Sequence, residues 1–166
     1  MALTTDIVAT YRNPAAALRR RAAGPPREDR ALVTLMLACG LYYIAQWPRI
    51  AREAHADESL TLQALLGGAL LGWIFVAPLL FYLIAALSHL VARLFGGQAR
   101  WYDARMALFW ALLATTPLAL LQGLTAGFVG PGPAETLVAV VSFGTFLVFW
   151  FLGLRLAESG EFADAA

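Results

Sequence analysis

Four long apolar stretches dominate the chain, and short polar segments separate them. They cover residues 31–47, 60–92, 107–129 and 136–154. A helix needs about 17 to 25 mainly apolar residues to cross a hydrocarbon core about 30 Å thick. The pattern therefore predicts an all-α integral membrane protein, with a bundle of four transmembrane helices over residues 31–156.

The second stretch is too long for one simple span. Residues 60–92 would form a helix of about 48 Å, whereas two spans would need about 40 residues plus a turn. Pro78 offers a turn, but its neighbours are apolar, and a turn at lipid depth would leave backbone groups without hydrogen bonds. We predict one long helix that tilts or projects beyond the membrane, leave open a kink at Pro78, and place its end at Gly96-Gly97.

The arginines fall mostly on one side of this arrangement. With four spans, only Arg49 and Arg52 lie opposite the two termini. Short basic loops resist translocation, so both termini, including the short tail 157–166, are predicted to be cytoplasmic, in a bacterial inner membrane. The arginines on the side of the termini are Arg12, Arg19, Arg20, Arg21, Arg27, Arg30, Arg93, Arg100, Arg105 and Arg155.

Residues 1–30 form a cytoplasmic amphipathic segment. Asn13 before Pro14 is typical of a helix cap followed by the first helical position. An apolar stripe predicts a helix lying at the membrane interface. The cluster Arg19-Arg20-Arg21 either contacts anionic lipid headgroups or binds a partner, and both interpretations stay open. The stripe consists of Leu3, Ile7, Tyr11, Ala15 and Leu18.

Small residues recur four apart in the second and third stretches. Such spacing allows helices to approach closely. Because consecutive spans are antiparallel neighbours, we expect the two series to pack together. Pro117 should bend the third span, with a threonine hydroxyl serving the acceptors that proline frees. The series are Ala64, Gly68 and Gly72 in the second stretch and Thr115, Ala119, Gly123 and Gly127 in the third.

Composition adds little chemistry to this picture. Hydrophobic residues make up 60% of the 166 residues and charged residues 14%, which leaves too little polar material to coat a soluble domain. Cys39 is the single cysteine. No Ser-His-Asp set, phosphate loop, carboxylate pair at membrane depth or metal-ligand spacing is present, so the sequence predicts no enzyme and no cofactor. His89 is either a proton-relay or ligand residue or a histidine tolerated near the headgroups.

The order of features resembles the bacterial branch of the Yip family of multi-spanning membrane proteins. The resemblance rests on Asn13-Pro14-Ala15-Ala16-Ala17-Leu18-Arg19, on His89 to Gly97 with Trp101, and on Ala114-Thr115-Thr116-Pro117-Leu118. It implies a helical bundle with a cytosolic N-terminus. Eukaryotic members bind Rab-type GTPases, and members of the family usually have five spans. This chain has four predicted spans and lacks their Asp-Leu-Tyr-Gly-Pro motif, so the Rab role is not carried over.

These observations favour a non-catalytic membrane scaffold or accessory subunit. We expect membrane lipids and another membrane protein or a cytosolic protein as partners, no nucleic acid, and leave a homo-oligomer open. The alternative is a small transporter or channel, with Gln122 and Ser142 on a minimal path. The residues expected to contact lipid or a partner are Asn13, Pro14, Arg19, Arg20, Arg21, Arg93, Gly96 and Gly97, and those expected to pack helices are Ala64, Gly68, Gly72, Pro117, Ala119, Gly123 and Gly127.

Overall fold

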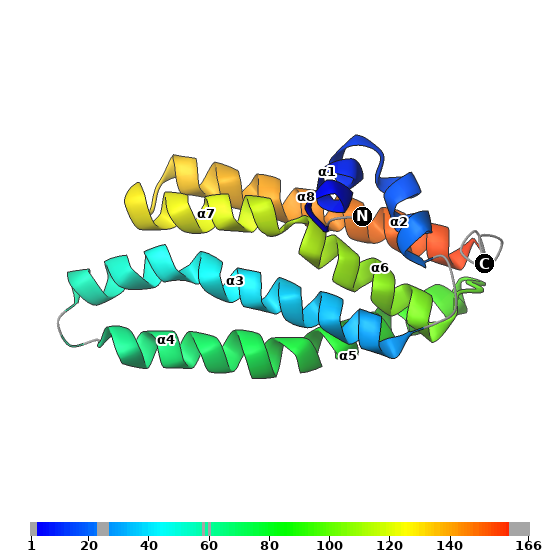
Figure 1. Ribbon diagram of the computed structural model, residues 1–166, viewed down its shortest axis with the longest axis horizontal. Coiled ribbons are helices and arrows are strands. Elements are labelled where there is room, and N and C mark those ends of the chain that lie inside the picture. Colours follow the sequence, from blue (N-terminus) through cyan, green and yellow to red (C-terminus); the bar gives the residue numbers. More distant parts are fainter. Residues whose placement is uncertain (1–2, 23–26, 58, 60, 160–166) are drawn as a thin grey trace.

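The computed structural model describes residues 3–22, 27–57, 59 and 61–159, and every element among them is a helix (Figure 1). The long helices run roughly parallel to one axis of the molecule, with α3 between α4 and α7. The elements are α1 (Leu3–Arg12), α2 (Pro14–Ala22), α3 (Glu28–Ala56), α4 (Leu62–Leu70), η1 (Leu71–Val76), α5 (Ala77–Leu94), α6 (Trp101–Ala114), α7 (Thr116–Phe128) and α8 (Pro133–Glu158).

Three of these helical runs are long and apolar enough to cross a membrane. They are α3 with 29 residues, the continuous run Leu62–Leu94 with 33 residues, and α8 with 26 residues. The pair α6 and α7, bent by 42° at its break, would make a fourth. The described chain is therefore all-helical with three or four candidate spans.

The run Leu62–Leu94 contains a π-helical segment, η1, which ends at Val76, two residues before Pro78. Within it the N–H of Ala77 donates to the carbonyl of Gly72, five residues back. Pro78 has no N–H, and its ring would clash with the preceding turn of a regular helix. A π-turn is a common way to fit such a residue without ending the helix. This explains how one helix continues through the proline.

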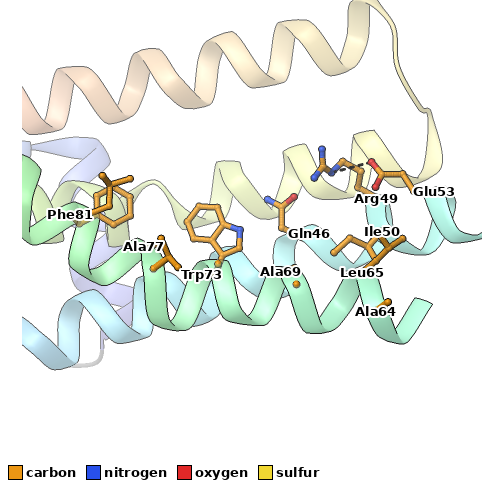
Figure 2. Close-up of a pocket in the computed structure, with 14 residues that line it drawn as sticks. Gln46, Arg49, Ile50, Glu53, Ala64, Leu65, Ala69, Trp73, Ala77 and Phe81 are labelled. Atoms are coloured by element: carbon orange, nitrogen blue, oxygen red, sulfur yellow. Dashed lines mark ion pairs between the residues drawn. The ribbon is translucent and has the colours of Figure 1, made fainter. Parts of the chain in front are cut away.

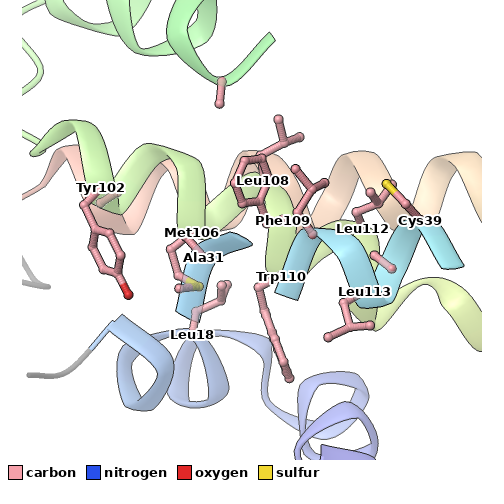
Figure 3. Close-up of a cluster of buried hydrophobic side chains, with 14 of the residues drawn as sticks. Leu18, Ala31, Cys39, Tyr102, Met106, Leu108, Phe109, Trp110, Leu112 and Leu113 are labelled. Atoms are coloured by element: carbon pink, nitrogen blue, oxygen red, sulfur yellow. The ribbon is translucent and has the colours of Figure 1, made fainter. Parts of the chain in front are cut away.

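The centre of the fold is α6, which is buried on nearly every side. Phe109 and Trp110 have no exposed surface, and the other apolar side chains from Met106 to Leu113 are also buried. Helices α1, α2, α3, α5 and α8 all contact α6. Figure 3 shows Trp110 pointing toward the N-terminal helices, where Leu18 points back into the same cluster.

The N-terminal helices α1 and α2 pack against the protein through their apolar stripe. Ile7 and Leu18 belong to the central core. Trp110 Nε1 donates to the hydroxyl of buried Thr10 at 3.2 Å. Part of the predicted stripe is therefore covered by α6 and α8, whereas Tyr11 stays 43% exposed, and the interfacial position of this segment stays a prediction. The predicted cap at Asn13 is confirmed, since its Oδ1 accepts from the Ala16 N–H at 3.1 Å.

The break between α6 and α7 carries its own hydrogen bonds. The Thr115 hydroxyl donates to the Ala111 carbonyl and the Thr116 hydroxyl to the Leu113 carbonyl, both at 2.8 Å. Leu113 is the residue whose carbonyl loses its usual partner because Pro117 has no N–H. The predicted role of the threonines is therefore confirmed.

A third bond at this break comes from α1, because the Tyr11 hydroxyl donates to the Ala114 carbonyl at 3.0 Å. Burial raises the pKa of the Tyr11 phenol, so it keeps its proton and remains a donor. A hydrogen bond from α1 thus closes the bend between α6 and α7.

The two small-residue series do not meet, so the predicted packing of the second-span series against the third-span series is wrong. A Cβ added at Gly123 would overlap the Ala45 backbone, and one at Gly127 would overlap Pro48, both in α3. At Gly68 and Gly72 a Cβ would have no neighbour within 4 Å. The bend after α6 directs α7 onto α3, which then separates α7 from α4 (Figure 1).

Candidate functional site at the basic end

We call one end of the bundle the basic end, because exposed arginines gather there. At this end α3 begins, α5 ends, α6 begins and α8 ends (Figure 1). The opposite end, called the far end, holds the α3–α4 connection and the α7–α8 turn. The exposed arginines of the basic end are Arg27, Arg30, Arg93, Arg100 and Arg155, and the half-buried Arg105 lies there too.

A partly buried carboxylate joins three parts of the basic end. Glu158, in the last turn of α8, places Oε1 3.0 Å from His89 Nδ1 of α5. Its other oxygen, Oε2, accepts from the Ala99 N–H at 3.0 Å, and its backbone carbonyl accepts from the Gln98 N–H at 3.3 Å. The His89 side chain is 1% exposed and that of Glu158 12%. This set, here called the clasp, ties the α5–α6 connection to both helices.

Two glycines shape the connection that the clasp holds. Gly96 has φ +86°, a left-handed conformation that favours glycine, and it ends α5 as predicted. The Gly97 N–H then donates to the Ala92 carbonyl at 3.0 Å. A Cβ at Gly97 would overlap the Glu158 carboxylate. The predicted Gly96-Gly97 pair therefore both stops the helix and lets Glu158 approach the backbone.

Polar side chains next to the clasp fix the start of α6. Asp103 Oδ2 accepts from the backbone N–H of Arg100 at 3.3 Å and from its Nε at 3.0 Å. Asp103 Oδ1 is buried without a hydrogen-bond partner in the described part of the chain. Arg105 pairs with Glu28 of α3 at 2.5 Å, and its guanidinium lies 5.9 Å from the centre of the Tyr82 ring. The start of α6 is thus bound to α3 and α5.

The clasp borders a groove of about 880 Å³ between the ends of α5 and α8. Phe95, 87% exposed, projects beside it, and exposed Arg155 lies on its α8 side. The wall and rim are formed by Ala92, Phe95, Gly96, Gly97, Phe151, Leu152, Leu154, Arg155 and Glu158. The groove combines an apolar wall with one arginine, Arg155, and the carboxylate of Glu158. A mainly apolar lining suits a protein segment more than a small polar substrate.

The structure brings only some of the predicted contact residues together. Gly96 and Gly97 line the groove, and exposed Arg93 precedes them in the last turn of α5. Arg19 and Arg20 are exposed on α2. The side chain of Arg21 lies outside the described residues. Asn13 and Pro14 serve as the cap and start of α2.

Sequence reasoning missed Glu158 and the backbone donor at Ala99. Glu158 lies 69 residues from His89 in the chain, so no local spacing links them. The only available signal was the isolated His89 near a helix end, which needed a partner if buried. Within the described residues no group of three or more His, Cys, Asp or Glu side chains is placed to hold a metal ion.

No family model, curated protein or solved structure matches this chain.

Proposed function

We propose that this chain is a non-catalytic scaffold or accessory protein of a bacterial inner membrane, similar to the Yip family, that binds a protein partner at its basic end. The observation that carries the proposal is the clasp. A partly buried, hydrogen-bonded carboxylate holds the α5–α6 connection in one conformation, so the groove and the exposed Phe95 beside it are presented as a fixed surface.

The proposed arrangement has four spans, with α6 and α7 together forming the third. The uneven distribution of arginines supports cytoplasmic termini and a cytoplasmic basic end. Single cysteines at Asp57, Gln98 and Gly132 should then label from outside, inside and outside the membrane, respectively. Labelling of Gln98 from outside would contradict the four-span arrangement.

Site-specific photocrosslinking tests the binding surface. A photoreactive amino acid replacing Phe95 should give one discrete protein adduct in cells, because Phe95 borders the groove. The matched control replaces Phe128 at the far end, which is 80% exposed against 87% for Phe95. Glu158→Ala should abolish the Phe95 adduct while the protein still inserts and purifies. The same adducts at both positions, or none at Phe95, would contradict the proposal.

A small transporter is the second candidate, because Gln122 and Ser142 do line a cavity toward the far end. That cavity and the groove at the basic end share no lining residue. The described structure therefore favours a scaffold over a continuous path. Solute flux by purified protein in liposomes that is lost in Gln122→Leu would favour the transporter over the scaffold.

A further inference from the structure

Three adjoining hollows occupy the side of the bundle near the far end, away from the clasp. A groove of about 610 Å³ lies between α3 and the run α4–η1–α5. It shares Gln46, Arg49 and Trp73 with a polar hollow of about 420 Å³ that α7 and α8 also line. An inner hollow of about 390 Å³ shares Trp73 with both. We call the three together the far cavity.

The groove is apolar over two turns of its wall. Gly68 and Gly72 face it with open space where a Cβ would stand, and Ala64 continues the same line. Leu71 and Phe75, beside this wall, are 59% and 60% exposed. The groove therefore opens along a helix whose outer surface is apolar, as a lipid-facing helix requires.

The polar end of the far cavity holds the cation of Arg49 beside the carboxylates of Glu53 and Glu135. Arg49 and Glu53 form an ion pair at 3.7 Å with both side chains about half exposed, so the pair is weak and a phosphate can replace Glu53 as the partner of Arg49. Its neighbour Arg52 differs, because it donates to the Gly127 carbonyl at 3.1 Å and fills the space beside Gly130. Figure 2 shows Trp73, Gln46 and Arg49 following one another along the groove.

The inner hollow contains a hydroxyl with no partner among the described residues. Ser142 is 5% exposed, and its Oγ makes no hydrogen bond there. Other helical hydroxyls donate back to their own helix, as Thr145 does to the Val141 carbonyl at 2.8 Å. A buried polar atom without a partner is costly. Ser142 thus marks the inner hollow as a place where a polar ligand atom would be stabilised.

We propose that the far cavity binds one phospholipid from the membrane leaflet at the far end. Arg49 binds the phosphate, with the amides of Gln46 and Gln122 beside it, and one acyl chain lies against Gly68 and Gly72. A ligand that is anionic at one end and apolar along its length matches this order of residues, and guanidinium pairs well with phosphate. The Ser142 hydroxyl supplies a donor for an ester carbonyl. This site is independent of the surface at the basic end.

Native mass spectrometry of the purified full-length protein tests the proposal. The protein is stripped of lipid in detergent and titrated with dioleoylphosphatidylglycerol. We expect one tightly retained lipid per chain in the wild type. Gly68→Leu with Gly72→Leu should weaken retention at least tenfold by filling the groove, and Arg49→Gln should weaken it about tenfold. The open space at both glycines allows the protein to fold with leucine there.

Matched controls separate this site from general lipid adhesion. Gly40→Leu adds the same side chain at a different glycine, which lies in α3, also has open space and does not line the cavity. Arg52→Gln removes the same charge at the same end. Both should retain lipid as the wild type does.

Two further ligands identify the recognised chemistry. Dioleoylglycerol lacks the phosphate and should bind at least tenfold more weakly, and glycerol phosphate lacks the chains and should not compete. Equal retention in all variants, equal binding of dioleoylglycerol, or competition by glycerol phosphate would each overturn the proposal.

Discussion

Two pairs of glycines with the same four-residue spacing have opposite surroundings in this molecule. Gly123 and Gly127 of α7 lie against the backbone of α3, so close that a Cβ would overlap it. Gly68 of α4 and Gly72 of η1 face open space. Equal spacing therefore does not imply equal roles, because a small-residue series can support helix contact or leave a groove empty.

The difference between the pairs follows from the bend at Thr115-Thr116-Pro117. Before the bend, α6 packs among α3, α5 and α8, whereas after it α7 packs on α3 and α8. The run α4–η1 then contacts α3, and the described residues leave open space beside its glycines. Three substitutions test how far this contrast holds.

Gly123→Leu should have the largest effect. Its side chain would enter the Ala45 backbone, which a rotamer change cannot relieve. We expect a loss of about 3 kcal/mol or more in the free energy of unfolding, or failure to fold. Thermal unfolding in mild detergent and monodispersity on size exclusion measure this. Wild-type stability in Gly123→Leu would show that α3 and α7 are not in close contact.

Tyr11→Phe should have an intermediate effect. It removes only the hydroxyl that donates to the Ala114 carbonyl at the bend, and one such bond contributes about 1 kcal/mol. Hydrogen exchange should also become faster at the amides around the bend. The control is Tyr43→Phe, because the structure describes a ring contact with Trp47 but no hydroxyl bond for Tyr43. Equal losses in both variants would contradict a specific role for Tyr11.

Gly68→Leu should have the smallest effect, despite being the same chemical change as Gly123→Leu. Open space at this position accommodates the side chain, and leucine has a higher helix propensity than glycine. We expect the free energy of unfolding to stay within about 0.5 kcal/mol of the wild type or to rise. A loss comparable to that of Gly123→Leu would contradict the open space at Gly68 and show that another segment packs against α4.

Local sequence signals predicted local structure well. Three features depend only on residues within one or two turns. They are the end of α5 before Gly96, the cap at Asn13 and the threonine hydrogen bonds near Pro117. Each reflects a backbone group that must find a partner or a conformation that only glycine adopts easily.

Helix partners could not be predicted in the same way. In a membrane, lipid and protein interior are equally apolar. Hydropathy therefore does not tell that Phe109 packs against other helices whereas Phe75 faces outward. The former has no exposed surface and the latter is 60% exposed. The clasp was hidden for a related reason, because its two side chains come from helices far apart in sequence.

The bonds between α1 and α6 also govern the order in which the molecule can be assembled. Thr10 and Tyr11 find their partners 100 and 103 residues later in the chain. Loop closure over such distances is slow compared with helix formation. Helix α1, which leaves the ribosome before α6, thus reaches its final place only after α6 has been synthesised. A nascent chain arrested before α6 should leave α1 open to protease, and one arrested after α8 should protect it.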